Sequence, residues 1–173
     1  MISVPPPIIG IVGWKNSGKT TLTVGLVEEL VGRGLRVSTI KHAHAHFDID
    51  HPGRDSHRHR TAGASEVAIV SPKRWAVMHE LRGEPEPSLD EMVARMSPCD
   101  LIVVEGYKNA AHFKVEVRRH GARQRDPIAP SDPSVIAVAS DDPSSEPPSP
   151  PVFGISDVPR IADLICAQLQ LGV

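Results

Sequence analysis

The sequence predicts an α/β fold, a three-layer sandwich with a largely parallel central sheet. Short aliphatic runs alternate with helical patterns along most of the chain. Hydrophobic residues make up 40% of the composition but aromatic residues only 3%, so a core built from Val, Ile, Leu and Ala is expected. Such a core suits a parallel sheet covered by helices. The length of 173 residues and the lack of a clear linker predict one domain over residues 1–173.

The first forty residues predict a strand, a loop, a helix and a second strand. The aliphatic run Ile8–Val12 is typical of a buried strand. Apolar residues then recur at helical spacing over Thr20–Val31, and Gly32 and Gly34 end that helix. Leu35–Ile40 predicts the next strand, with a right-handed crossover between the two strands.

Later segments continue the alternation of strands and helices. Strands are predicted at Val67–Val70, Trp75–Met78, Leu101–Val104, Val135–Ala139 and, half-buried because it alternates, Phe113–Val117. Helices are predicted from a cap at Asp55 or Ser56 to about Ala62, over Ser88–Met96 and over Val158–Leu169. The polar segments Lys41–Pro52 and Asp142–Pro151 are expected to be loops.

One motif between the first strand and helix indicates phosphate binding. Residues 13–20 read G-W-K-N-S-G-K-T, the P-loop pattern, in the strand-to-helix context that the motif requires. Gly13 permits a sharp turn, and Gly18 lets the backbone approach the phosphates closely. The Lys19 ammonium is expected on the β- and γ-phosphates and the Thr20 hydroxyl on Mg²⁺. These features predict the P-loop NTPase form of the α/β sandwich. The residues expected at the nucleotide are Gly13, Lys15, Asn16, Ser17, Gly18, Lys19, Thr20 and Thr21.

The role of Lys15 has two readings, a loop cation near the phosphates or a solvated side chain.

A second acidic group is expected beside the P-loop to complete the Mg²⁺ shell. Glu105 directly follows the buried strand Leu101–Val104, at the carboxyl end where ligands bind in open α/β sheets. Glu105 is therefore a candidate metal ligand with Thr20 and a candidate catalytic group. The alternative is a surface acid at the end of a strand. Asp100, at the other end of the strand, is interpreted as a cap.

The segment Lys41–His51 is rich in histidine and aspartate. If it is extended, His42, His44 and His46 share one face and, with Asp48, can bind Zn²⁺ or Ni²⁺. Equally, the segment can be a polar loop over the nucleotide or substrate. In a third reading, Asp48 or Asp50 orients a water molecule near the γ-phosphate, which makes Asp48 a candidate catalytic residue.

Charge and composition exclude several classes of protein. A net charge of -2 and a pI near 6.5 give no global electrostatic case for nucleic-acid binding. Arginines nevertheless gather at residues 54–60 and 118–125, where they face either a polyanionic small molecule or solvent. Cys99 and Cys166 form no CxxC pair and are expected to be reduced thiols. Without a long apolar run or a signal peptide, the protein is expected to be soluble and cytoplasmic, with no membrane partner.

Taken together, these stretches resemble the molybdopterin-guanine dinucleotide biosynthesis protein B family. The resemblance spans roughly the first two-thirds of the chain. It is carried by residues 13–21, 39–42 with 47–50, 52–64 (PGRDS, then RHR and AGA), and DLIVVEGYK at 100–108 followed by KVEVR at 114–118. The chain departs from the family pattern at Phe113, where a proline is expected, and at Ala43 and Ala45, which separate the histidines.

The resemblance implies a GTP-binding protein with Mg²⁺ and at most slow GTPase activity. It also implies a homodimer that works as an adapter beside the guanylyltransferase that attaches GMP to molybdopterin, and by extension near proteins that carry molybdopterin. Arg54 is then expected to cover the nucleotide or a pterin phosphate. The chain has no Asn-Lys-x-Asp motif, and Asp141, after the strand Val135–Ala139, is the candidate for the guanine edge.

Two other functions stay open on the sequence alone. The histidine-rich segment fits a GTPase that inserts a metal, although a CxxC motif and a long histidine tract are missing. A small-molecule kinase would use the same fold with Arg118–Arg125 as a lid, but no residue specifies its acceptor.

Overall fold

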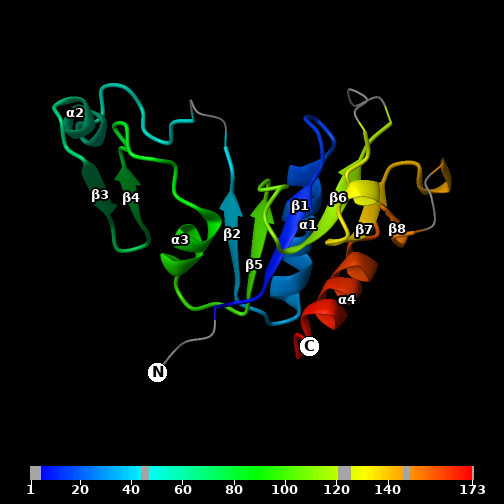
Figure 1. Cartoon of the computed structure of the whole chain (residues 1–173). Helices are drawn as coiled ribbons and strands as arrows, with labels where there is room; N and C mark the ends of the chain where they lie inside the picture. The colour runs from blue at the N-terminus through cyan, green and yellow to red at the C-terminus, as the bar shows by residue number, and fades with distance from the viewer. Residues whose placement is uncertain (1–4, 44–46, 121–125, 146–148, 173) are drawn as a thin grey trace. The chain divides into compact units, whose positions relative to one another are not determined.

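The computed structural model describes residues 5–43, 47–120, 126–145 and 149–172 (Figure 1). The chain divides into two compact units. The first comprises Met1–His42 and Leu89–Val173, and the second comprises Ala43–Ser88. Each unit has more contacts within itself than with the other. A single domain over the whole chain stays a prediction.

The first unit is built on a parallel sheet. Its strands are β1 (Ile8–Val12), β2 (Val37–Lys41), β5 (Leu101–Glu105), β6 (Phe113–Arg118), β7 (Val135–Ser140) and β8 (Val152–Gly154). They form a six-stranded sheet in the order β2-β5-β1-β6-β7-β8, and every neighbouring pair is parallel. Strand β1 lies between β5 and β6, with β2 and β5 on one side of it and β6, β7 and β8 on the other. The strand order therefore reverses at β1, and ligands of open α/β sheets bind at such a reversal.

Helices cover both faces of this sheet, which confirms the predicted three-layer sandwich. On one face, α1 (Lys19–Gly32) and α4 (Val158–Leu169) pack against each other and bury a leucine- and isoleucine-rich core with β1, β5, β6 and β7. On the other face, α3 (Leu89–Ala94) buries Leu89 and Val93 against β2 and β5. No helix in the described part of the chain is long and apolar enough to span a bilayer.

Two details of this unit differ from the sequence prediction. Strand β6 is buried on both faces, and not half-buried as expected, because the residues Lys114 and Glu116 are each only 1% exposed. The segment 126–134 supplies partners for both side chains. Strand β8 was not predicted, since its three residues follow a Pro/Ser-rich stretch that hides the pattern.

The second unit contains the short helix α2 (Asp55–Thr61) and the strands β3 (Glu66–Val70) and β4 (Trp75–His79). The two strands were predicted, but they pair with each other in an antiparallel hairpin and do not join the parallel sheet. The helix begins at Asp55, so its N-cap is Arg54, which makes no side-chain cap bond. The Ser56 hydroxyl donates instead to Asp50 at 2.9 Å, so the predicted caps are wrong.

Charges stabilise this second unit, because few apolar residues are buried in it. The Arg60 side chain is 15% exposed and pairs with Asp48 at 2.9 Å, Asp50 at 3.3 Å and Glu80 at 2.7 Å. Hydrogen bonds to Glu80 and Asp48 raise the pKa of the guanidinium further above its usual value. Arg60 therefore links Asp48 and Asp50, which precede α2, to Glu80, which follows β4.

Replacing Arg60 is expected to loosen the second unit. Arg60→Ala leaves three carboxylates together without their shared cation, so the amides of β3 and β4 should exchange with solvent faster than in the parent protein. Arg58→Ala is the control, since Arg58 is exposed and its pair with Asp55 spans 3.8 Å. Equal exchange in the two variants, measured by hydrogen–deuterium exchange, would contradict this role for Arg60.

Candidate functional site

Parallel pairing brings the predicted site residues of the first unit to one edge of the sheet. In β5, Glu105 lies opposite Ile11 of β1 on one side and Lys41 of β2 on the other. The carboxyl ends of these three strands therefore meet where β1 passes into the loop at Gly13. The expectation that Glu105 lies beside the P-loop is met by this register.

The loop backbone adopts conformations that favour glycine. Gly13 has φ +146° and Gly18 has φ +96°, and Asn16 lies in the left-handed region at φ +66°. A Cβ atom on Gly13 would lie 2.5 Å from the carbonyl oxygen of Val117 and 2.7 Å from Ser17 Oγ. The loop thus depends on the missing side chain at Gly13 to pass β6.

The helix that follows the loop presents a positive end. Helix α1 begins at Lys19, has Gly18 as its N-cap and carries no acidic residue in its first turn. The Lys19 ammonium donates to the carbonyl oxygen of Trp14 at 2.8 Å, so it lies folded over the loop. Burial lowers the pKa of Lys19; the charge of Glu105 acts in the opposite direction, and that of Lys41 lowers the pKa as well.

Thr20 and Glu105 are direct neighbours. The Thr20 hydroxyl lies 3.0 Å and 3.1 Å from the two carboxylate oxygens of Glu105. The Lys41 ammonium lies 3.4 Å from one of the same oxygens. Glu105 is a buried residue, so its charge is held by the two side chains around it. Sequence reasoning had not given Lys41 a role, although its place at the end of the strand beside β5 is the signal.

The carboxyl ends of β2 and β5 are also closely packed. The His42 amide donates to the Glu105 carbonyl oxygen at 2.9 Å, and the rings of His42 and Tyr107 lie 4.6 Å apart. A Cβ atom on Gly106 would lie 2.9 Å from that of His42, and Gly106 has φ +102°. The glycine after Glu105 therefore lets the chain turn beside His42.

The remaining loop residues differ in exposure. Lys15, Asn16, Thr20 and Thr21 are exposed, whereas Ser17 is buried. Among the described residues, Ser17 Oγ has no hydrogen-bond partner. Arg119 and Ile155 approach the loop at Gly18, whose ideal Cβ position is 3.8 Å and 3.2 Å from them. Neither residue was predicted near the loop, because both come from connections distant in sequence.

Asp141, the candidate for the guanine edge, lies directly after β7. Its carboxylate accepts the His120 amide at 2.7 Å, and Arg119 lies 3.9 Å from its other oxygen. The carboxylate thus organises the chain that follows β6. Its role toward a base stays a prediction.

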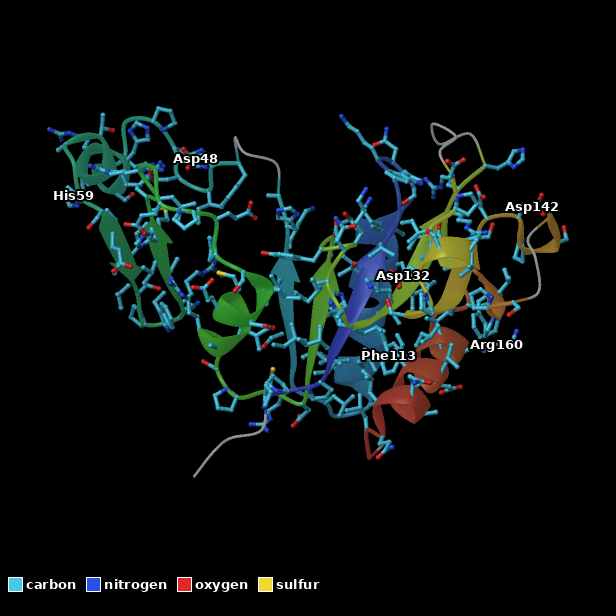
Figure 2. The ribbon with its side chains drawn as sticks, viewed as in Figure 1. Asp48, His59, Phe113, Asp132, Asp142 and Arg160 are labelled. Carbon is cyan, nitrogen blue, oxygen red and sulfur yellow. The ribbon has the colours of Figure 1, made fainter. Side chains whose placement is uncertain are left out.

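The other predicted site residues belong to the second unit. Asp48, labelled in Figure 2, accepts the Asp50 amide at 2.8 Å and pairs with Arg60. These two bonds, the amide first, hold the pKa of Asp48 below its usual value. Arg54 is exposed. Water positioning by Asp48 and nucleotide contact by Arg54 stay predictions.

The proposed histidine metal site falls partly outside the structure. His44 and His46 lie outside the described residues. Within the described ranges, no group of three His, Cys, Asp or Glu side chains is arranged to hold a metal ion.

The arrangement around the loop fits a phosphate chain with a divalent cation. The loop bends through left-handed conformations at the positive end of α1, where backbone amides bind anions. Lys19 adds a cation that donates to a carbonyl oxygen of the loop. Thr20 and Glu105 place a hydroxyl and a carboxylate within 3.1 Å of each other, a donor set of oxygens that suits Mg²⁺.

The comparisons with known proteins agree with this geometry. The model of the family described as "Molybdopterin guanine dinucleotide synthesis protein B" (MobB) matches residues 8–141. A molybdopterin-guanine dinucleotide biosynthesis adapter protein of Escherichia coli (strain K12) is 39% identical over 166 residues, which cover 95% of this chain and 94% of the relative. The protein of the same description from Haemophilus influenzae is 38% identical and covers 92% of this chain and 87% of the relative.

Solved structures show the same fold. A crystal structure of molybdopterin-guanine biosynthesis protein B superposes with a TM-score of 0.72 at 28% identity, covering 94% of this chain and 99% of the other. The structure of Bacillus subtilis MobB gives a TM-score of 0.73 at 25% identity, covering 96% and 99%.

Gly13→Ala is expected to destabilise the first unit. The new methyl group would meet the backbone of β6 at 2.5 Å, in a conformation that side chains rarely adopt, so we expect a loss of at least about 1–3 kcal/mol of unfolding free energy. Gly32→Ala is the control, because nothing lies within 4 Å of its Cβ position in the helix. Urea unfolding that shows equal stability for both variants would refute the steric account.

Proposed function

The chain belongs to the molybdopterin guanine dinucleotide synthesis protein B (MobB) family, and from this premise we propose that its P-loop binds GTP together with Mg²⁺. It is an adapter in molybdopterin-guanine dinucleotide biosynthesis, the role by which its relatives of 39% and 38% identity are named. The product joins a pterin to a guanosine nucleotide. A guanine nucleotide is therefore the ligand that the pathway supplies to a phosphate-binding loop.

The observation that carries this proposal is the contact between Thr20 and Glu105 beside Lys19. The hydroxyl and carboxylate lie 3.0 Å apart, at the start of the helix that follows the glycine-rich loop. Lys19 is the cation for the β- and γ-phosphates, and it would exchange the Trp14 carbonyl, 2.8 Å away, for phosphate oxygens. Partial burial of Lys19 favours this exchange, because a desolvated ammonium gains more electrostatic stabilisation from an anion than a solvated one does.

Thr20 and Glu105 are the residues that would hold Mg²⁺, the first by its hydroxyl and the second by its carboxylate. When bound, the ion neutralises charge on the phosphate oxygens. Lys41, 3.4 Å from Glu105, would share the carboxylate with the ion or leave it. In either case, the positive charge of Lys41 stays at the edge where the phosphates lie.

We further propose that Asp141 contributes to recognition of the guanine edge. A carboxylate can accept hydrogen bonds from the amino group and ring N–H of guanine. Asp141 follows β7 at the carboxyl edge of the sheet, and Arg119, which approaches Gly18 of the P-loop, also lies near its carboxylate. Direct contact of Asp141 with the base would complement the phosphate contacts of the P-loop.

The proposed activity is binding and presentation, with slow GTP hydrolysis at most. Relatives of high coverage are named adapters, and an adapter acts through a partner. The partner proposed here is the guanylyltransferase that joins GMP to molybdopterin, with proteins that carry molybdopterin as further candidates. We also propose that the protein works as a homodimer in the cytoplasm.

Lys19→Ala is expected to abolish GTP binding. Loss of a charge-assisted contact to phosphate should weaken the affinity at least about a hundredfold, about 3 kcal/mol. Calorimetric titration with GTP and Mg²⁺ measures it, with thermal unfolding to show that the fold is kept. Unchanged affinity for GTP would contradict the proposal that the P-loop binds the nucleotide. The same titration of Lys15→Ala decides whether that exposed lysine contacts phosphate or only solvent.

Glu105→Gln is expected to remove the Mg²⁺ dependence of GTP binding while it preserves the size of the side chain. The amide keeps one oxygen for the Thr20 hydroxyl but loses the charge that favours a divalent cation. In the parent protein, chelation of Mg²⁺ should weaken GTP binding by about tenfold or more. An identical response to chelation in the variant would show that Glu105 does not hold the ion.

A further inference from the structure

A cavity lies beside the P-loop within the first unit. Its volume is about 620 Å³, within the range of small-molecule sites. It opens on the face of β6 away from α1 and α4, because Lys114 lines it while the next residue, Val115, belongs to the core under those helices. The side chains that matter for its chemistry are Trp14, Lys108, Lys114, Asp126, Ser131 and Asp132.

Trp14 connects this cavity to the phosphate loop. Its backbone carbonyl oxygen accepts the Lys19 ammonium at 2.8 Å, whereas its indole lines the cavity. The indole N–H donates to the carbonyl oxygen of Asp126 at 3.1 Å, which fixes the plane of the ring. The Lys108 ammonium lies 4.4 Å from the centre of that ring. A flat aromatic surface is therefore held next to the P-loop, within reach of a cation.

The rest of the cavity is polar and balanced in charge. Lys114, whose side chain is 2% exposed, donates to Asp132 at 2.9 Å and also to Ser134. Figure 2 labels Asp132, which belongs to the segment facing β6. With Lys108 and Asp126, the lining holds two ammonium and two carboxylate groups. Such a balance suits an uncharged ring with several hydrogen-bonding groups better than a phosphate.

Part of the cavity lies away from the nucleotide edge. Lys114 is the second residue of β6, and Ser134 directly precedes β7, so this part of the lining lies toward the amino ends of those strands. The P-loop follows the carboxyl end of β1. A nucleotide held along the carboxyl edge leaves the face of β6 to another ligand.

We propose that this cavity binds the pterin ring of a molybdopterin-type ligand, stacked on the indole of Trp14. This inference rests on the proposed function, in which the P-loop holds the guanosine nucleotide. The pterin ring carries a 2-amino-4-oxopyrimidine edge, whose N–H groups match carboxylates such as Asp126 and whose oxygen matches an ammonium such as Lys108. Guanine has the same edge, so the experiment must separate the two sources.

The test uses energy transfer from tryptophan to 6-hydroxymethylpterin. The chain has two tryptophans, so Trp75→Phe leaves Trp14 as the only donor. We expect saturable transfer from Trp14 to the bound pterin in this variant. Ser131→Phe, made in the Trp75→Phe background, fills the cavity from an exposed lining position and should weaken pterin binding at least about tenfold. Ala94→Phe, at the exposed end of α3, is the matched control and should bind normally.

Saturating GTP with Mg²⁺ decides which ring occupies the cavity. Transfer that persists with GTP present supports a separate pterin site. Transfer abolished by GTP would overturn the inference, because the cavity would then belong to guanine. No transfer in a protein that binds GTP by calorimetry would also overturn it while the nucleotide proposal stands. Transfer in a protein that does not bind GTP would support the pterin site in the cavity and refute the nucleotide proposal.

Discussion

Parallel pairing of β5 with both β1 and β2 is the constraint on which the candidate site depends. It sets Glu105 opposite Ile11 and Lys41, so the acid, the cation and the start of the P-loop meet at one edge. A change of register by one residue would turn Glu105 into the core and an aliphatic residue toward the loop. The buried strand is thus what gives the carboxylate its position, and the apolar residues before Glu105 serve the site as much as the core.

On the face of β6 away from α1 and α4, charged side chains are buried with polar partners. The segment 126–134 covers that face of β6 through charged and backbone contacts. Glu116 accepts the amides of Ile128 and Ala129 at 2.9 Å each, and Lys114 pairs with Asp132 at 2.9 Å. Each buried charge therefore has its partners, which burial requires. The same segment lines the cavity beside Trp14, so the structure there is held by polar contacts that also suit a polar ring.

Much of the first unit follows from the sequence, because its signals are local. An aliphatic run of four or five residues predicts β1, β5 and β7, and the P-loop motif fixes the start of α1. The same reading failed for Lys114 and Glu116, since alternation in β6 looks like a strand with one face in solvent. Apart from Arg118, which pairs with Glu116 at 2.8 Å, their partners lie a dozen or more residues away, so no local sequence pattern predicts them.

The second unit was harder to predict for a related reason. Its strands were recognised, but the choice between joining a parallel sheet and forming a separate hairpin depends on pairing, which the residues of a single strand do not determine. The triple pairing of Arg60 was likewise missed, because it joins residues from 48 to 80. By contrast, the pairing of Thr20 with Glu105 was predicted from general requirements of the P-loop, which name both partners in advance.

The central claim, that this family member binds a guanine nucleotide through its P-loop, is tested most directly by calorimetric titration with GTP, GDP and ATP, each with Mg²⁺. The account predicts that GTP binds at least about tenfold more tightly than ATP, which shares its phosphates but differs in its base. Equal affinity for GTP and ATP, or a preference for ATP, would contradict the guanine assignment. No binding of any of the three would contradict the phosphate-binding role of the loop itself.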